Sequence, residues 1–155
     1  MEHLWTPWRM KYIAGEKNHD CIFCAALAHN DDRETLIVQR NPHTFIMLNK
    51  YPYNNGHLMV VPNLHSADLA MLNAATQSEL MGSITRAIEW LSAASRPEGF
   101  NVGLNLGKAG GAGITEHLHF HVVPRWTGDT NFMTIGSETR VIASGWMTPG
   151  AACAR

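Results

Sequence analysis

A chain of 155 residues is long enough to bury one hydrophobic core, and its 45% hydrophobic and 16% charged residues are ordinary for a globular domain. The formal net charge of −1 lacks the basic excess of proteins that wrap nucleic acid, so we expect no nucleic acid partner. No apolar run approaches the roughly 20 residues needed to span a bilayer, so we expect no membrane association.

The N-terminal sequence predicts no export signal. MEHLWTPWRMKYI has no continuous apolar core after its first charges, which a secretory signal peptide requires. We therefore expect a cytoplasmic protein. Its three cysteines, Cys21, Cys24 and Cys153, are then expected to be reduced.

The first part of the chain predicts an arm followed by three strands. Residues 1–20 are aromatic and polar without a period, which favours an arm laid over the body. Its residues Trp5, Trp8 and Tyr12 are expected to pack rather than to stack on a base. Short runs separated by turn formers predict strands at Thr35–Gln39, His43–Asn49 and His57–Pro62.

The second part predicts helices and then two more strands. Ser66 is expected to cap a short helix, and apolar residues at helical spacing predict a long helix at Ala75–Ser95. The apolar stripe of the long helix is Leu80, Ile84, Ala87, Ile88 and Leu91. The last strands are predicted at Phe100–Leu106 and at His117–Val123, the second ended by Pro124, with the loop Gly107–Gly113 between them.

The order of these elements predicts an α+β fold. Three strands, a block of helices and a strand–loop–strand unit favour antiparallel pairing, with the helices segregated from the strands. We expect a sheet of about five antiparallel strands with one long and one short helix. The expected division is an N-terminal arm at 1–20, a domain at 21–135 and a C-terminal extension at 136–155.

Three histidines alternate with apolar residues in the last predicted strand. Because side chains alternate between the faces of a strand, His117, His119 and His121 project from one face. The residues that then face the core are Leu118, Phe120 and Val122. This group predicts either a catalytic site for phosphate chemistry or a metal site, since histidines two apart on a strand can share a metal.

Phosphate chemistry has a use for each imidazole. A neutral imidazole is a good nucleophile near pH 7 because its reference pKa is about 6.5. A second imidazole donates to phosphate oxygens, and a third fixes the tautomer of the nucleophile through its other ring nitrogen. Covalent capture of the phosphorus then splits one difficult displacement into two easier steps.

The sequence HLHFHVV at 117–123 resembles the signature of the histidine triad (HIT) family. Residues 49–62, NKYPYNNGHLMVVP, are similar to the family's ribose-binding loop and the strand that follows it. Residues 96–134 and 4–13 resemble the branch that contains bacterial diadenosine tetraphosphate phosphorylases and Fhit-type hydrolases. The resemblance covers roughly residues 4–135.

This resemblance implies a fold, an assembly and an activity. The family fold is an α+β sheet that pairs into a homodimer, and the implied activity is cleavage of dinucleoside polyphosphates, such as diadenosine tetraphosphate, at the α-phosphate. His119 is implied as the nucleophile that forms a nucleotidyl-histidine, with His121 on phosphate and His117 supporting the site. The implied substrate contacts are Asn49 at the ribose, His57 behind the triad and Asn105 at a phosphate.

The glycine-rich loop before the triad departs from many relatives. Many carry Gln-Ser or Gln-Thr four and three residues before the first histidine, where this chain has Gly113 and Ile114. Backbone N–H groups of the loop are then expected to bind phosphate, since glycines permit close approach. Further substrate contacts are expected from Lys108, Gly111, Gly113 and Thr115, and after the triad from Arg125 and Trp126.

Two cysteines early in the domain have the spacing of half a zinc site. Cys21 and Cys24 form a CxxC pair, and no thioredoxin-like βαβ pattern surrounds them. Many bacterial histidine triad proteins carry such a pair with two histidines, which here are His65 and His117, so a structural zinc ion is expected. The alternative is two small buried thiols.

Three functions are compatible with these observations. The first is hydrolysis or phosphorolysis of dinucleoside polyphosphates, which the segment VPRWTGDTNF favours. The second is a Hint-type hydrolysis of nucleoside phosphoramidates. The third is non-catalytic nucleotide binding, against which the intact triad argues. The sequence leaves open whether water or phosphate removes the nucleotide from His119.

Overall fold

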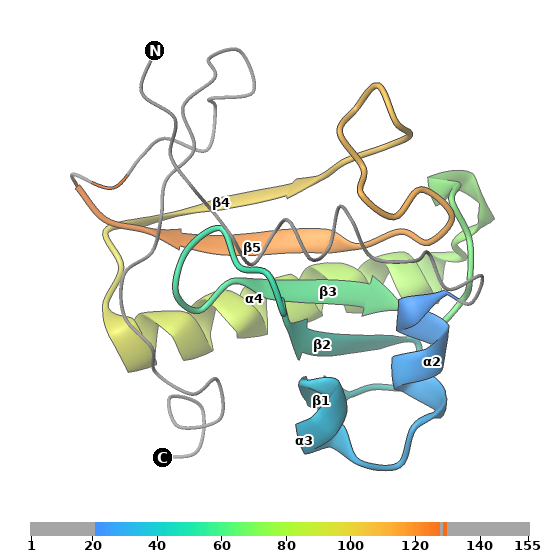
Figure 1. Ribbon diagram of the computed structural model, residues 1–155, viewed down its shortest axis with the longest axis horizontal. Helices are drawn as coiled ribbons and strands as arrows, with labels where there is room; N and C mark the ends of the chain where they lie inside the picture. The colour runs from blue at the N-terminus through green and yellow to red at the C-terminus, as the bar shows by residue number, and fades with distance from the viewer. Residues whose placement is uncertain (1–20, 128, 130–155) are drawn as a thin grey trace.

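The sheet of this protein, in a computed structural model that describes residues 21–127 and 129, has five strands. Their order is β1-β2-β3-β5-β4, and every neighbouring pair is antiparallel (Figure 1). The strands are β1 (Ile37–Arg40), β2 (Thr44–Leu48), β3 (Leu58–Pro62), β4 (Gly99–Leu104) and β5 (Phe120–Arg125). The predicted five-stranded antiparallel sheet is confirmed.

Helical segments cover both faces of this sheet. They are α2 (Ile22–Ala28), α3 (Asp32–Thr35), the 3-10 turn η1 (Leu69–Met71) and α4 (Ala74–Ser95). The long helix α4 lies along one face, against β2, β3 and β5 (Figure 1). On the opposite face Phe23 and Ala26 of α2 join Met47, Met59 and Val61 in a second buried cluster. The predicted α+β class is confirmed.

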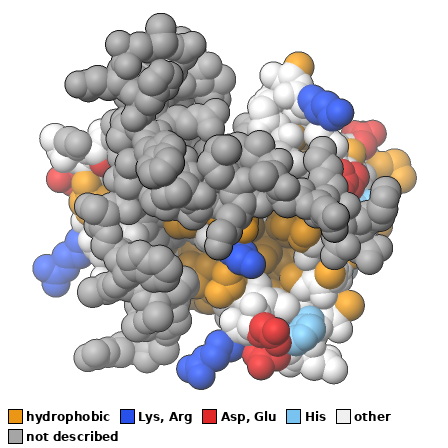
Figure 2. Space-filling view, in the orientation of Figure 1, with side chains coloured by type: hydrophobic (Ala, Val, Ile, Leu, Met, Phe, Trp, Pro, Cys, Tyr) orange, Lys and Arg blue, Asp and Glu red, His pale blue; other side chains and the backbone are white. Residues whose placement is uncertain are grey.

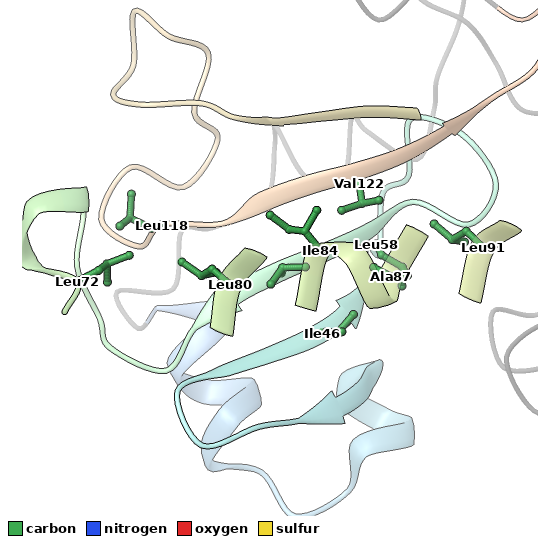
Figure 3. Packing of buried hydrophobic residues seen from close by; sticks show 10 residues of the cluster. Ile46, Leu58, Leu72, Leu80, Ile84, Ala87, Leu91, Leu118 and Val122 are labelled. Carbon is green, nitrogen blue, oxygen red and sulfur yellow. The ribbon is translucent and has the colours of Figure 1, made fainter. Parts of the chain in front are cut away.

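The larger core lies between α4 and the sheet (Figure 3). Leu58, Val60 and Val122 pack there against the buried residues of α4. Those residues of the helix are Leu80, Ile84, Ala87 and Leu91. The alternate residues of β3 belong to the cluster on the other face, so all five residues of β3 are buried.

Capping residues set both ends of helix α4. The Asn73 side chain accepts a hydrogen bond from the N–H of Thr76 at 2.8 Å and caps the N-terminus. At the C-terminus Arg96 has a left-handed backbone, with φ 47°, and Pro97 cannot continue the helix. The predicted helix at Ala75–Ser95 is confirmed to within one residue.

The short helix after β3 differs from the prediction. It is a single 3-10 turn whose N-cap is Asp68 rather than Ser66. The Asp68 carboxylate accepts the N–H of Ala70 at 2.9 Å, whereas the Ser66 hydroxyl accepts the N–H of Asp68 at 3.0 Å. Ser66 therefore shapes the turn that leads to the cap, and Asp68 supplies the cap itself.

Two further helices, α2 and α3, are absent from the sequence-based prediction of one long and one short helix. They have seven and four residues, which is too short to show a helical period. The predicted strand at Thr35 begins instead at Ile37, because Thr35 ends α3 and Leu36 has φ 64°. The left-handed residue separates the helix from β1.

The last strand also differs from the prediction. β5 begins at Phe120 rather than at His117, and it continues through Pro124 to Arg125. Pairing of β3 with β5 ends at Val122. Pro124 lies where β5 pairs with β4 alone, and a residue without an N–H is tolerated at such a position.

No helix within the described ranges is both long and apolar enough to cross a membrane. On the face in Figure 2, the visible Lys and Arg side chains lie apart from one another. The predicted arm at 1–20, with Trp5, Trp8 and Tyr12, and the predicted extension at 136–155 lie outside the described residues.

We predict that Gly56→Ala destabilises the fold. Gly56 has φ +79°, and a Cβ there would lie 2.8 Å from Leu91 Cδ2. Backbone strain and displacement of a core side chain together should lower the free energy of unfolding by about 1–3 kcal/mol. Urea unfolding measures this change. The matched control is Gly82→Ala in α4, where nothing lies within 4 Å; it should stabilise by about 0.5–1 kcal/mol. Equal effects of the two substitutions would contradict the prediction.

Candidate active site and metal centre

The triad segment keeps the alternation that its sequence predicts, although its first residues precede β5. Leu118 and Val122 are buried in the core beneath α4. The rings of His117 and His119 contact Phe23, on the opposite face. His117, His119 and His121 are 1%, 5% and 5% exposed, so the histidines form a buried group rather than an open surface.

A backbone hydrogen bond selects the reactive nitrogen of His119. Its Nδ1 lies 2.9 Å from the carbonyl oxygen of His117. Because a carbonyl oxygen only accepts, Nδ1 carries the proton and Nε2 keeps its lone pair. Burial lowers the pKa of His119, which keeps the ring neutral near pH 7. A neutral ring with an unprotonated Nε2 is the form that attacks an electrophile.

His57 makes His121 a hydrogen-bond donor. The N–H of Tyr53 donates to His57 Nδ1 at 3.1 Å, so the proton of His57 is on Nε2. His57 Nε2 then donates to His121 Nδ1 at 2.9 Å. The one proton of neutral His121 is therefore on its Nε2. The rings of His121 and His119 meet edge to face, with centroids 4.9 Å apart, which brings a donor beside the His119 ring.

The loop between β2 and β3 holds His57. Asn49 Nδ2 lies 3.4 Å from His57 Nδ1, and Asn49 Oδ1 accepts the N–H of Tyr51 at 2.8 Å. The Tyr53 ring stacks on His57, with centroids 5.0 Å apart and planes 19° apart. The structure thus brings the predicted residues Asn49 and His57 together. The sequence analysis does not identify Tyr53, because one aromatic residue in a loop gives no pattern.

Burial keeps the two histidines neutral. Burial, and after it the charge of His119, lowers the pKa of His121 to about 4. Burial also lowers the pKa of His57 well below its usual value, and the charge of His121 adds to this shift. Near pH 7 neither ring is charged, so the order of donors and acceptors through the pair is maintained.

Cys21, Cys24, His65 and His117 meet in one cluster, with ligand atoms that all lie within 4.8 Å of one another. Cys21 Sγ lies 3.2 Å from His117 Nδ1, and Cys24 Sγ lies 3.3 Å from His65 Nδ1. Tetrahedral zinc, with bonds of roughly 2.0–2.3 Å, places its ligand atoms roughly 3.3–3.8 Å apart. The donor set fits a zinc ion, and the pairs at 3.2 and 3.3 Å are close to the spacing that zinc requires.

His117 joins this cluster to His119. Its Nε2 donates to the carbonyl oxygen of Pro62 at 2.9 Å, so Nδ1 faces the cysteines with its lone pair. A backbone carbonyl group behind a histidine ligand commonly fixes the tautomer that binds a metal. The carbonyl oxygen of the same residue accepts the proton of His119. Whatever holds His117 therefore also holds His119.

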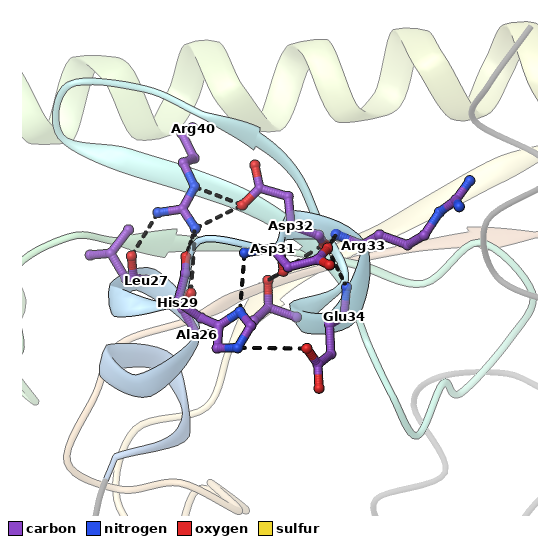
Figure 4. A network of polar contacts seen from close by, with 9 residues as sticks. Ala26, Leu27, His29, Asp31, Asp32, Arg33, Glu34 and Arg40 are labelled. Atoms are coloured by element: carbon purple, nitrogen blue, oxygen red, sulfur yellow. Dashed lines mark hydrogen bonds and ion pairs between the residues drawn. The ribbon is translucent and has the colours of Figure 1, made fainter.

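Arg40 anchors α2, the helix that follows Cys21 and contains Cys24. The Arg40 guanidinium donates to the carbonyl oxygens of Leu27 at 2.6 Å and His29 at 2.8 Å, and it pairs with Asp32 (Figure 4). Carbonyl groups at the end of a helix have no partner within it, so Arg40 closes the C-terminus of α2. Near the other end Phe23 is fully buried, with its ring centroid 5.0 Å from that of His119.

Known proteins are similar to this chain in sequence and in fold. Residues 30–128 match the HIT domain. The chain belongs to the HIT family. An AP-4-A phosphorylase from Mycobacterium tuberculosis is 45% identical over 150 residues, which cover 92% of this chain and 77% of that protein. The predicted family membership is confirmed.

Solved HIT structures share the fold. A zinc-bound histidine triad family protein from Mycobacterium smegmatis has a TM-score of 0.61 and 27% identity, over 70% of this chain and 77% of that one. A hypothetical histidine triad nucleotide-binding protein from Sulfolobus tokodaii has a TM-score of 0.61 and 28% identity, over 70% of this chain and 71% of that one. These similarities confirm a HIT-like α+β fold.

The loop before the HIT triad uses some of its polar groups internally. The N–H of Gly111 donates to Lys108 O at 3.0 Å, and the N–H of Ala112 donates to Gly107 O at 3.1 Å. Asn105 Nδ2 lies 3.4 Å from Gly111 O and ties the loop to the end of β4. Two of the loop amides expected on phosphate are thus engaged within the loop. Phosphate contacts from Lys108, Gly111, Gly113 and Thr115 stay predictions.

Two other residues near the HIT triad, Ile114 and Arg125, make contacts within the protein. Ile114, at one of the two positions where the sequence departs from the expected pattern, packs against the cluster around Phe23. Arg125 Nε lies 3.0 and 3.1 Å from the two carboxylate oxygens of Asp129, and Arg125 Nη1 donates to Asn101 Oδ1 at 3.1 Å. Ile114 thus contributes apolar packing, and the Arg125 guanidinium is engaged by Asp129 and Asn101. A contact of Arg125 with a distal phosphate stays a prediction.

We predict that acid weakens the fold through His121. The usual histidine pKa is 6.5 and that of folded His121 is about 4, so the unfolded chain binds more protons in between. The free energy of unfolding should fall as the pH drops from 6.5 toward 4, by about 3 kcal/mol from this residue.

Urea unfolding at about pH 7.5 and about pH 5 measures the loss, with each protein compared with itself at the higher pH. The His121→Gln variant should lose about 2 kcal/mol less than the wild type between these two values. The same loss in both proteins would show that His121 does not carry the effect.

Proposed function

We propose that this HIT protein cleaves dinucleoside polyphosphates, such as diadenosine tetraphosphate, at the α-phosphate, with His119 as a covalent nucleophile. The observation that carries the proposal is the hydrogen bond from His119 Nδ1 to the His117 carbonyl oxygen at 2.9 Å, which leaves Nε2 to attack. The 45% identity to an AP-4-A phosphorylase supports this substrate class over a phosphoramidate. An intact nucleophile argues against nucleotide binding alone.

In the first step His119 Nε2 forms a bond to the α-phosphorus, and the bond from this phosphorus to the bridging oxygen of the polyphosphate breaks. The bridging oxygen keeps the electron pair, so diadenosine tetraphosphate gives an adenylyl-histidine and ATP. A phosphate chain leaves readily, so the site must chiefly position the nucleophile and stabilise charge. His121, with its proton on Nε2, supplies a donor for a phosphoryl oxygen.

In the second step an acceptor attacks the same phosphorus and releases His119. Water as the acceptor yields AMP, and inorganic phosphate yields ADP. The similarity to a phosphorylase favours phosphate. Incubation with diadenosine tetraphosphate, with and without inorganic phosphate, separates these two outcomes by their products.

The positions of Asn49 and Asn105 near the triad support substrate contacts for both residues. Asn49 lies beside His57, at 3.4 Å between Nδ2 and Nδ1. The last pair of β4 and β5 is Leu104 with Phe120, so Asn105 directly follows β4 at the end where His119 directly precedes β5. We assign Asn49 to the ribose and Asn105 to a phosphate oxygen.

A structural zinc ion is proposed for Cys21, Cys24, His65 and His117. When bound there, zinc would crosslink the start of α2 to the triad segment, and it would orient His117 rather than activate the substrate. Reduced thiols suit this role, so a reducing compartment such as the cytoplasm fits the site.

A homodimer is proposed through β4. Within the described residues, β4 pairs only with β5, so its other edge is open to a second chain. Val102 of this strand is 44% exposed. An uncovered strand edge with an apolar residue is a common site of association between sheets.

We predict that protein prepared without chelator contains about one zinc ion per chain by elemental analysis. Cys24→Ser should lower the zinc content and the thermal midpoint, because it removes one thiolate ligand. The control is Cys153→Ser, which changes a cysteine outside the predicted cluster. A zinc-free wild type, or a Cys24→Ser variant with unchanged stability, would rule out the structural ion.

We predict that His119→Ala lowers kcat by several powers of ten with diadenosine tetraphosphate, because it removes the covalent nucleophile. Nucleotide affinity should change far less, since binding uses other groups. Steady-state kinetics and calorimetry measure the two effects. His43→Ala, which alters an exposed histidine, is the control and should keep full activity. Turnover of His119→Ala at a near-normal rate would refute the mechanism.

A further inference from the structure

The loop at residues 49–57 orients His57 but has no regular secondary structure of its own. The N–H of Tyr53 reaches His57 Nδ1 at 3.1 Å, and the Tyr53 ring stacks on the same imidazole. This N–H is the shorter of two donor contacts to His57 Nδ1, the other being Asn49 Nδ2 at 3.4 Å, and the tautomer of His57 in turn sets the donor at His121. The position of Tyr53 is therefore set by whatever tethers the loop.

Asn54, the next residue, is the tether. Its Nδ2 donates to Asp129 Oδ2 at 2.8 Å and to the carbonyl oxygen of Pro124 at 3.2 Å. Its Oδ1 accepts the N–H of Asn55 at 3.1 Å, and its backbone carbonyl oxygen accepts the N–H of His57 at 3.1 Å. One side chain thus joins the loop to the segment at the end of β5.

Asp129 is itself held from several sides. Arg125 Nε lies within 3.1 Å of both carboxylate oxygens, and the N–H of Trp126 donates at 2.9 Å. Burial acts to raise the pKa of Asp129, but the hydrogen bonds from Arg125 and Trp126 outweigh it, so the pKa lies below the usual value. Because the two side chains are 17% and 18% exposed, solvent screens this pair weakly.

We propose that Asn54 and Asp129 are positioning residues for nucleotidyl transfer to His119. They hold the N–H of Tyr53 on His57 Nδ1, and this contact keeps the His121 proton on Nε2. The catalytic part of this inference rests on the proposed function, whereas the part about tautomers can be tested without substrate.

Loss of the tether has a specific consequence. If the loop shifts, His57 Nδ1 loses the N–H of Tyr53 and keeps only the longer contact with Asn49 Nδ2, at 3.4 Å, so the two tautomers of His57 come closer in energy. His57 then offers His121 a proton in only part of the molecules. In the rest, His121 carries its proton on Nδ1 and presents no donor beside the nucleophile.

Nitrogen-15 spectra of the imidazole rings near neutral pH test this consequence directly. In the wild type, His57 and His121 should each show a protonated Nε2 and an unprotonated Nδ1. Asn54→Ala should give averaged signals for both rings, which reflect two tautomers. The matched control is Asn55→Ala, an exposed neighbour in the same loop, which should give the wild-type spectrum. An unchanged spectrum for Asn54→Ala would overturn the inference.

Steady-state kinetics provide a second test of the inference. Asn54→Ala should lower kcat with diadenosine tetraphosphate by about three- to tenfold, the range expected for one lost hydrogen bond, with little change in KM. In a His57→Gln background the same substitution should have no further effect, because the residue through which it acts is gone. If Asn54→Ala lowers kcat by the same factor in the His57→Gln background as in the wild type, Asn54 has a general structural role and the inference is overturned.

A second variant covers the case in which Asn54→Ala fails to fold. Asp129→Asn keeps the shape of the side chain but removes the charge that holds Arg125, and it should shift the same imidazole signals in the same direction. If the wild type leaves diadenosine tetraphosphate intact, the proposed function fails. The spectra of the variants would still decide whether the tether sets the tautomers.

Discussion

The backbone carbonyl oxygen of His117 accepts the Nδ1 proton of His119, and the chemistry of the site depends on this hydrogen bond. A His119 ring with its proton on Nε2 would have no lone pair to offer a phosphorus atom. His117 is in turn fixed twice, by its Nε2–H on Pro62 O at 2.9 Å and by the Leu118 N–H on Ser66 O at 2.8 Å. The proposed nucleophile is therefore oriented by the fold before any substrate binds.

The four buried histidines of the site share one energetic problem. Burial disfavours a charged imidazole. The neutral rings are tolerated in the interior because each ring nitrogen that carries a proton has an acceptor or faces the site. Burial lowers the pKa of His57, His119 and His121, so the rings stay neutral at the pH where a nucleophile is needed. The same shifts make the fold sensitive to acid. Reactivity at neutral pH and loss of stability at low pH have one cause.

Local sequence patterns were sufficient to predict the elements whose apolar residues recur with a short period. The period of two in HLHFHVV predicts which side chains face the site, and the spacing in 75–95 predicts α4. The tether of Asn54 to Asp129 joins residues 75 positions apart, and Arg40 closes a helix that begins 18 residues earlier, at Ile22. Such contacts, like the extension of β5 through Pro124, depend on which segments meet in the fold, so no local pattern encodes them.

The most direct test of the account is chemical capture of the intermediate. The enzyme is mixed with diadenosine tetraphosphate in the absence of inorganic phosphate, quenched within the first turnover, and digested for peptide mass spectrometry. The account predicts an adenylyl group on the peptide that contains the triad, located at His119 by fragmentation. Turnover without any adduct, or an adduct on a residue other than His119, would contradict it.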